Sequence, residues 1–337
     1  MNQSVDPFSD EQARVLVNLA QHYGAWIEAE RAMAGLPYGM RWKTSGGRDY
    51  LCRIIDRAGN ATSLGPRSPE TEAVLAEYRE RRAATEAARD GAGDRLEVSA
   101  RQYRALLLPM IPAEAAAILR EADRRSLLGS HLLAVGTNAI PAYCVEAAGR
   151  ILGASDETDD FDMAWVAVGA DPASNPVWAM LKAVDHTYTV NTERPFQARN
   201  AKAFEFELLA APSRLPGMGR RDQPRPVPLP EQEWLLNGRP VSHVVVARDG
   251  SPARLAVPDP RWFALQKLWM SVQEKRNPLK RGKDERQGLA VLDAVADAMP
   301  QYPLGAGFEA EIPAELEPHY ERWKAARNGR PRPSRGW

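Results

Sequence analysis

The chain lacks the features that mark several large protein classes. It has two cysteines in 337 residues, Cys52 and Cys144, too few and too far apart for a disulfide framework or a cysteine-type zinc site. No apolar run approaches the roughly 18 residues of a membrane span. The first twelve residues, MNQSVDPFSDEQ, have no apolar signal-peptide core. We therefore expect a cytoplasmic protein with no membrane partner.

Charge of one sign and the common catalytic motifs are also missing. Lys+Arg and Asp+Glu number 44 each, so bulk charge points to neither nucleic acid nor membrane, although local patches still could. The five histidines form no HExxH pair, and the chain contains no GxxxxGK[ST] phosphate loop and no GxSxG elbow. With 44% hydrophobic residues, the chain can form a sizeable core and two or three domains.

The pattern of elements predicts an N-terminal module of helices and a β-hairpin over residues 1–128. The hairpin turns at Ser45-Gly46-Gly47, between alternating segments. A glycine-rich stretch, RDGAGD at 89–94, is expected to break the long charged helix that follows. The helices are predicted at 10–36, 69–88, 95–108 and 112–127.

From residue 129 the pattern changes to strand, helix, strand, which predicts a core over 129–260 and a helical lobe over 261–328. Residues 212–230, rich in Pro, Gly and Arg, are expected to be a mobile loop, and the basic tail 329–337 to be disordered. The fold class we expect is α+β, with a small mixed sheet and flanking helices. Strands are predicted at 132–135, 160–168 and 203–209, a β-hairpin at 240–257, and helices at 138–151, 172–182, 261–275, 283–299 and 314–326.

Carboxylates recur on two of the predicted strands. Asp160 and Asp162 in TDDFDMAWVAV share one face, and so do Glu205 and Glu207 in FEFELL, because strand side chains alternate. Paired carboxylates repel unless a cation lies between them, and Mg²⁺ or Mn²⁺ with substrate phosphates is a usual solution. The alternative is a solvated acidic loop, since residues 156–160 are mostly acidic. Asp162 fits that alternative poorly because it lies inside an apolar strand.

Two further features fit a phosphate ligand. Gly136-Thr137 follows an apolar strand and opens a helix, where free N–H groups attract anions; the alternative is a capped strand-to-helix turn. Lys267 is the only charge in WFALQKLWMSV at 262–272, and it either extends to the surface or faces an anion such as a nucleoside triphosphate. The basic run over 275–286 is either a solvated helix connection or a polyanion contact.

Together these motifs resemble the DNA polymerase β-like nucleotidyltransferase superfamily, in a bacterial branch of stand-alone proteins. The resemblance rests on GT at 136–137, TDDFDM at 158–163, FEFEL at 204–208, the hairpin at 41–66 and the helical segment 263–289. The order of these motifs gives the resemblance its specificity, because each one is short. The gap between Thr137 and Asp160 is longer than in better-known members. The third acid is Glu rather than the commoner Asp, which leaves Glu205 and Glu207 as alternatives.

The resemblance implies a transferase that moves a nucleoside monophosphate from an NTP to an acceptor hydroxyl and releases pyrophosphate. It implies that Asp160, Asp162 and Glu207 are catalytic and hold Mg²⁺ or Mn²⁺. Gly136, Thr137 and Lys267 would contact the nucleotide phosphates. The acceptor could be a protein, an RNA end or a small molecule, in a toxin-like or regulatory role. The alternative is a nucleic-acid-binding protein or a toxin–antitoxin partner with a degenerate core.

Overall fold

The computed structural model describes residues 4–56, 58–155, 160–169 and 174–329. The acidic segment 156–159 and the tail from residue 330 onward lie outside the described residues. The chain forms two compact units, one of Asn18–Ser99 and one of Met1–Val17 with Ala100–Trp337. No helix in the described ranges is both long enough and apolar enough to span a membrane.

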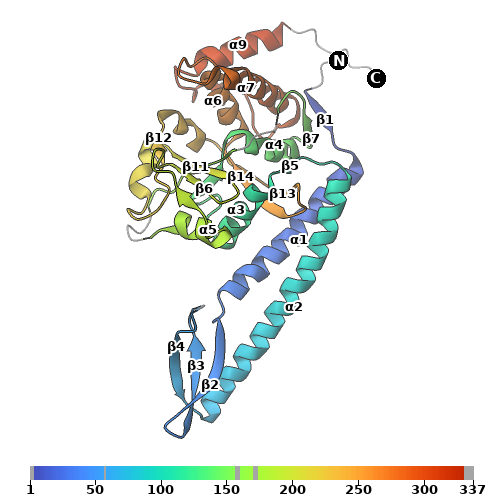
Figure 1. The fold of residues 1–337 in the computed structure, drawn as a ribbon. Helices are drawn as coiled ribbons and strands as arrows, with labels where there is room; N and C mark the ends of the chain where they lie inside the picture. The colour runs from blue at the N-terminus through green and yellow to red at the C-terminus, as the bar shows by residue number, and fades with distance from the viewer. Residues whose placement is uncertain (1–3, 57, 156–159, 170–173, 330–337) are drawn as a thin grey trace. The chain divides into compact units, whose positions relative to one another are not determined.

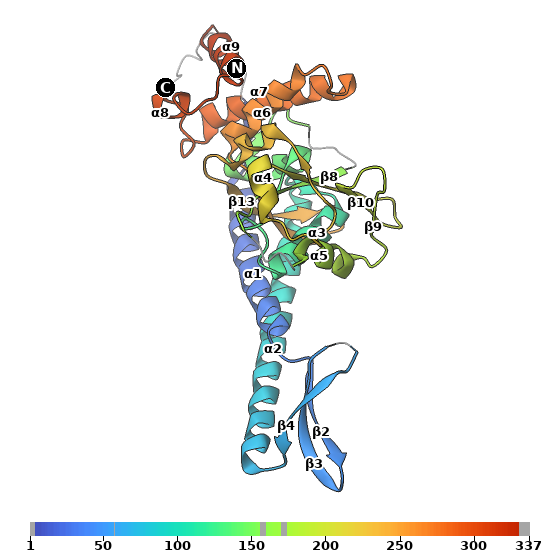
Figure 2. The same ribbon diagram turned by 90° about the vertical axis from the view of Figure 1, so that its left-hand side faces the viewer.

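The smaller unit combines two long helices with a three-stranded antiparallel sheet (Figure 2). The sheet contains the predicted hairpin and adds a third strand. Trp42 and Leu51 on one face of the sheet pack against Leu75 and Tyr78 of the second helix. The elements are α1 (Asp10–Ala34), β2 (Gly39–Ser45), β3 (Arg48–Ile54), β4 (Ala61–Pro66) and α2 (Pro69–Ala105).

Helix α2 runs without interruption through residues 89–94, so the predicted break there is wrong. A glycine inside a helix costs about 1 kcal/mol relative to alanine, and tertiary packing outweighs that cost here. A Cβ added to Gly93 would lie 3.8 Å from Trp26 Cδ1, so this small residue lies directly against the side chain of α1. The hydrogen bond of 2.8 Å between His22 Nδ1 and Ser99 Oγ also joins the two helices.

The larger unit contains the predicted small mixed sheet, which confirms the α+β fold class (Figure 1). Strand β8 is antiparallel to β6 but parallel to β11, and β11 is antiparallel to β10. Strand β12 adds to β11 in parallel. In the order of the sheet the strands are β6 (Leu132–Ala134), β8 (Asp160–Trp165), β11 (Glu205–Ala210), β10 (Gln197–Arg199) and β9 (Thr189–Val190), with β12 (Val227–Pro228) beside β11.

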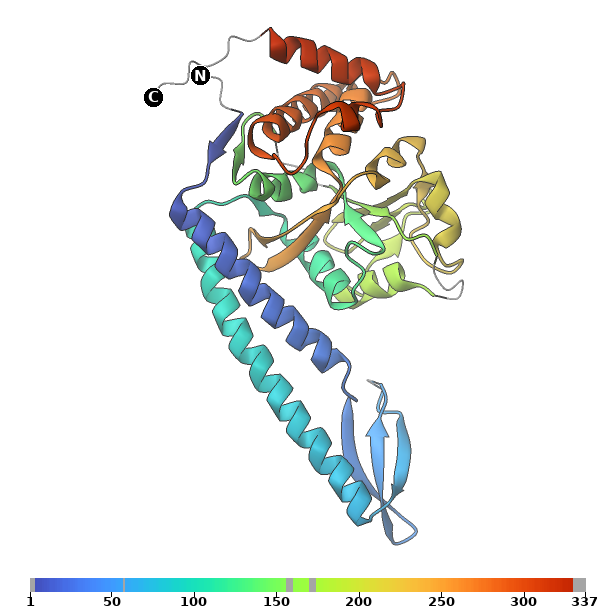
Figure 3. The ribbon, with the colours of Figure 1, turned by 180° about the vertical axis from the view of Figure 1, so that it is seen from behind.

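A second, three-stranded sheet and a group of helices complete this unit. The sheet is formed by β13 (Val241–Ala247), β14 (Pro252–Val257) and β5 (Met110–Ile111). Helices α6–α9 lie together at one end of the unit (Figure 3). The helices are α3 (Ala113–Arg124), α4 (Ile140–Glu146), α5 (Pro176–Val184), α6 (Pro260–Ser271), α7 (Pro278–Ala298), α8 (Ala306–Glu309) and α9 (Glu317–Asn328), with short 3₁₀ turns η1 (Gly136–Ala139), η2 (Pro212–Gly217), η3 (Pro230–Gln232) and η4 (Trp234–Leu236).

The helix predicted at 138–151 is shorter than expected. It ends at Glu146, and β7 (Gly149–Ile151) follows and pairs with β1 (Val5–Pro7). Ala148 has a φ of 49°, which a helix cannot accommodate. The segment 212–230 is also more regular than predicted, because η2 and β12 lie in it. Its buried Asp222 accepts backbone N–H groups at the start of α5.

Alternation along β8 and β11 separates the core from the polar face of the sheet. Phe161 and Met163 on β8, and Phe206 and Leu208 on β11, are fully buried in the main hydrophobic core. The residues between them therefore point to the opposite face. This arrangement places the acidic side chains of both strands on one side of the sheet.

Candidate active site

The acidic side chains of β8 and β11 lie next to one another. The two strands are parallel, with Asp162 opposite Glu207 and Asp160 opposite Glu205. Directly paired residues project from the same face of a sheet. The predicted carboxylates, 45 residues apart in sequence, are thus brought together by strand pairing.

A cavity of about 870 Å³ opens over this acidic face. Its lining includes all six residues predicted for the site: Gly136, Thr137, Asp160, Asp162, Glu207 and Lys267. Its lining also includes the apolar residues Phe196, Leu209, Val227, Leu229, Trp269 and Met270. The predicted residues therefore share one space that is large enough for a nucleotide.

Glu205 and Glu207 differ in their relation to this cavity. Gln197 Nε2 on β10 donates to Glu205 Oε2 at 3.0 Å and to Glu207 Oε1 at 3.1 Å. Only Glu207 lines the cavity, while Glu205 faces Arg199 at 3.9 Å with 38% of its side chain exposed. The geometry favours Glu207 as the third acid. Gln197 hydrogen-bonds to both carboxylates, and no pattern in the sequence indicated this role.

The turn at Gly136 requires a glycine for two reasons. Its φ is +68°, and a Cβ added there would lie 2.6 Å from Asp162 Oδ2. The Val135 N–H donates to the Asp162 carbonyl at 3.0 Å, and Asn138 Nδ2 donates to the Asp160 carbonyl at 2.9 Å. The turn is thus bonded to the backbone of the acidic strand, once through its own backbone and once through the Asn138 side chain.

Thr137 lies in the same turn, and its side chain already has a partner. It is 8% exposed and accepts a hydrogen bond of 3.4 Å from Gln287 Nε2 of α7. The hydroxyl at the wall of the cavity is therefore positioned by the C-terminal helices.

Burial and mutual repulsion raise the proton affinity of the carboxylates. Burial, followed by Asp160 and Glu207, raises the pKa of Asp162 to about 7. Burial and Asp160 also raise the pKa of Glu207. Asp162 Oδ1 is buried and accepts no hydrogen bond within the described parts of the chain. A buried acceptor without a donor is costly, and a cation would satisfy it.

The oxygen donors suit Mg²⁺ or Mn²⁺, but they are not assembled into a finished metal centre. Among the described residues, no three His, Cys, Asp or Glu side chains already stand as a metal-binding group. Lys280 Nζ lies 3.3 Å from Asp160 Oδ2, and as a cation it partly neutralises the acidic cluster. The chemistry of Asp160, Asp162 and Glu207 fits a divalent cation, which would compete with Lys280 for Asp160.

A group of cations at and before the start of α7 also lines the cavity. Asn277 caps this helix by accepting the Leu279 N–H at 2.9 Å. Lys275, Lys280 and Lys283 all line the cavity. Burial, and then Lys267, lower the pKa of Lys283. These lysines provide the positive charge that a polyphosphate requires.

Lys267 makes an internal ion pair that the sequence did not specify. Its Nζ donates to Asp284 Oδ1 at 2.7 Å, and the exposed fractions of the two residues are 4% and 1%. Arg276 Nε donates to the other oxygen of Asp284, also at 2.7 Å. Lys267 therefore lines the cavity as part of a buried triad, and its predicted contact with a triphosphate stays a prediction.

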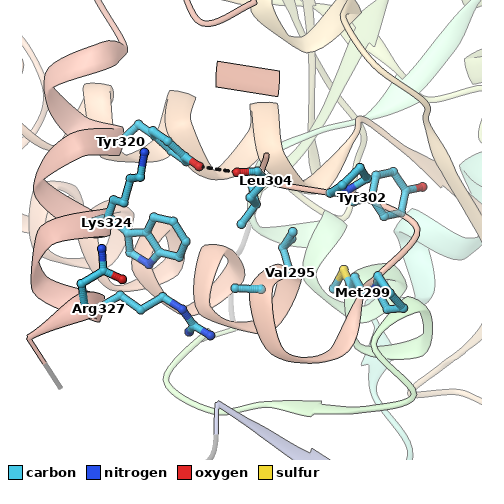
Figure 4. Close-up of a pocket in the computed structure, with 12 residues that line it drawn as sticks. Val295, Met299, Tyr302, Leu304, Tyr320, Lys324 and Arg327 are labelled. Atoms are coloured by element: carbon cyan, nitrogen blue, oxygen red, sulfur yellow. Dashed lines mark hydrogen bonds between the residues drawn. The ribbon is translucent and has the colours of Figure 1, made fainter. Parts of the chain in front are cut away.

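A second hollow, of about 450 Å³, lies between α7 and α9 and shares no lining residue with the first (Figure 4). Its two cations are ion-paired, Lys324 with Glu309 at 2.6 Å and Arg327 with Asp297 at 2.5 Å. The Tyr320 hydroxyl donates to the Leu304 carbonyl at 2.9 Å. This hollow has no charge to offer an anion and is best explained by the packing of α9.

An α+β unit with an acidic sheet face and a basic rim is suited to phosphoryl-group chemistry. The sequence pattern of a family described as Nucleotidyltransferase matches residues 113–309, more than half of the chain. The chain belongs to this nucleotidyltransferase family. Comparison with curated proteins and with solved structures found no match.

Proposed function

We propose that the chain is a metal-dependent nucleotidyltransferase of the DNA polymerase β-like kind. It would move a nucleoside monophosphate from an NTP to an acceptor hydroxyl. The observation that carries this proposal is the strand register that places Asp162 beside Glu207, with Asp160 on the same face, in one cavity. The family match supports nucleotidyl transfer in general. The superfamily, the metal and the acceptor belong to the proposal.

Each part of the cavity lining has a distinct role in this proposal. The triphosphate lies between the turn at Gly136 and the lysines at and before the start of α7, where opposite charge attracts it. The base lies against the apolar residues that include Trp269. Asp160, Asp162 and Glu207 would hold Mg²⁺ or Mn²⁺, and the chemistry that such an ion would supply is polarisation of the α-phosphate and neutralisation of charge on the leaving pyrophosphate.

The transfer balances in bonds and protons. The acceptor oxygen forms a bond to the α-phosphorus, and the bond from that phosphorus to the β-phosphate bridging oxygen breaks, which releases pyrophosphate. The proton of the acceptor hydroxyl passes to solvent water, and Glu207 would help to position the cation that activates this hydroxyl. Lys280 leaves Asp160 and pairs with the triphosphate.

The test is transfer from α-labelled NTPs. The purified chain is incubated with each NTP, with Mg²⁺ or Mn²⁺, and with cell lysate, and label is sought in protein, RNA and small molecules. Asp160→Asn with Asp162→Asn should reduce transfer by at least about a hundredfold, and Glu193→Gln, an exposed acid outside the cavity lining, should leave it unchanged. Unchanged transfer by the double variant would reject the proposal.

The alternative from the sequence is a nucleic-acid-binding or toxin–antitoxin partner protein with a degenerate core. All three acids are present and share one cavity, which favours the enzyme. Binding of nucleic acid or of a partner protein without any label transfer would favour the alternative.

A further inference from the structure

One face of the sheet of the smaller unit packs against helix α2. Trp42 and Leu51, which are directly paired, pack against Leu75 and Tyr78 of α2. Strand residues alternate between faces, so the neighbours of Trp42 and Leu51 in the chain project to the opposite side. This opposite side, which we call the basic face, is defined by Arg41, Lys43, Arg48 and Tyr50.

The register of β2 and β3 places these four residues together. Lys43 lies opposite Tyr50, and Ser45 lies opposite Arg48. Arg41 is two residues before Lys43 on the same strand, so the two share a face. All three cations are exposed, and Tyr50 is partly exposed.

The acids of this segment are on other surfaces. Asp49 pairs with Thr44 on the covered side and hydrogen-bonds its hydroxyl at 2.6 Å. Asp56 lies beyond the end of β3 and accepts the Asn60 side chain at 2.6 Å. Over the described residues of β2 and β3, the basic face thus has three cations and no carboxylate. Net positive charge is concentrated here although the chain as a whole is neutral.

We infer that the basic face binds single-stranded RNA. Exposed Arg and Lys side chains on a flat sheet attract the phosphate backbone, and an aromatic side chain among them offers a surface on which an unpaired base can stack. Within a duplex the bases are already stacked on one another and would not reach Tyr50. A protein partner fits less well, because stable protein interfaces have an apolar centre with few charges.

The choice of RNA over DNA rests on the proposed function. Both kinds of strand end in a 3′ hydroxyl that can accept a nucleotide, but only RNA also offers a 2′ hydroxyl on every ribose as an acceptor. The basic face would then hold the acceptor, which the family match leaves unspecified. The binding itself does not require the transfer reaction, so the two ideas can fail separately.

The test measures binding of the full-length chain to a fluorescent 20-nucleotide single-stranded RNA of mixed sequence. We expect Arg41→Gln, Lys43→Gln and Arg48→Gln together to weaken binding at least tenfold. Each phosphate contact to a single strand contributes about 0.7 to the magnitude of the slope of log affinity against log salt concentration. Removing three cations should therefore reduce that magnitude by about 2. The matched control is Arg79→Gln, Arg81→Gln and Arg95→Gln, exposed cations on α2 of the same unit, which removes equal charge and should bind as wild type does.

Several results would overturn the inference. They are unchanged binding by the basic-face variant, an equal loss in the control variant, or equal affinity for a DNA strand or a duplex of the same length. Displacement of the RNA by an acidic polypeptide at equal charge concentration would point to a protein partner instead. Unchanged melting temperatures for both variants show that they remain folded.

A separate arm distinguishes this inference from the proposed function. Asp160→Asn with Asp162→Asn should bind the RNA normally while losing label transfer. If wild type transfers no label to any acceptor but the basic-face variant still loses RNA, the binding inference stands and the transfer proposal fails. If transfer to RNA occurs and the basic-face variant performs it with an unchanged KM, the face has no role in holding the acceptor.

Discussion

At the scale of single residues, Asp162 combines the strongest signals in the molecule. Its side chain is half-buried, its buried Oδ1 has no hydrogen-bond donor among the described residues, and its pKa is raised to about 7. A carboxyl with a pKa above its unfolded value binds protons more tightly in the folded state. Its ionisation therefore destabilises the fold as pH rises from about 4 to 7. A carboxylate whose ionisation destabilises the fold is expected at a site where a bound cation stabilises the negative charge.

We predict that Asp162→Asn stabilises the metal-free protein at high pH. The amide cannot ionise, so the variant should be more stable than wild type by about 4 kcal/mol at pH 8. The difference should vanish only below about pH 3, where Asp162 is protonated in both the folded and the unfolded state. Urea unfolding in EDTA across this pH range measures it. A gap that widens towards low pH would show that the sign is wrong.

Lys267 gives a second prediction at this scale. Asp284 is buried and holds Lys267 and Arg276, each at 2.7 Å. Lys267→Met leaves Asp284 with Arg276 alone, and breaking a buried pair on one side costs about 3 kcal/mol. Urea unfolding of the ligand-free protein should show this loss, whereas Lys275→Met, at an exposed position on the same cavity, should show none.

The double variant Lys267→Met with Asp284→Leu separates structure from ligand binding. Removing both charges leaves no unpaired carboxylate, so most of the stability should return. If NTP affinity nevertheless falls in the double variant, the lysine also faces the ligand. If affinity is unchanged, the predicted triphosphate contact of Lys267 is wrong.

At the scale of elements, strand β11 decides which glutamate serves the site. Glu205 and Glu207 share one face and one partner, Gln197, but only Glu207 lines the cavity. Glu207→Gln should therefore lower kcat for transfer by at least about a hundredfold, while Glu205→Gln should change it less than about threefold. Steady-state kinetics with the labelled acceptor measures both. The reverse order would move the third acid two residues along the strand.

The sequence predicted the elements whose pattern is local and missed those that depend on distant contacts. Alternation located β8 and β11, and with them the acidic face. The glycines at 91 and 93 suggested a helix break, yet packing against Trp26 outweighs their cost. Strands β9 and β10 are only two and three residues long, too short to show a period.

The same contrast between local patterns and distant contacts applies to the residues of the site. Asp160, Asp162 and Glu207 could be proposed from the sequence because alternation and motif order are visible in one dimension. Gln197 and Asp284 were missed because nothing local distinguishes a glutamine or an aspartate that reaches a partner through the fold. Long-range pairings of this kind need the tertiary structure.

At the scale of the whole molecule, chemistry and the family match belong to the same unit. Residues 113–309 lie entirely within the larger unit, which also contains every residue of the cavity. The smaller unit, Asn18–Ser99, lies outside the matched range. The family match therefore covers the acidic cavity but not the basic face of the smaller unit. RNA binding is the function that we assign to that face.

This division leads to a prediction about where a nucleotide stabilises the chain. A ligand slows only those opening reactions that destroy its site. With NTP and Mn²⁺ at a hundred times their Kd, stabilisation is about 2.7 kcal/mol, which corresponds to roughly hundredfold slower hydrogen exchange for amides that exchange through unfolding of the larger unit. Amides of β8, β11 and the start of α7 should show this slowing, and those of β2, β3 and β4 should not.

Mass spectrometry of exchanged peptides resolves the two groups, and Asp160→Asn with Asp162→Asn serves as the control that should show no slowing. Equal slowing in β2–β4 would mean that the two units open as one, because only a shared opening reaction lets a ligand in one protect amides in the other.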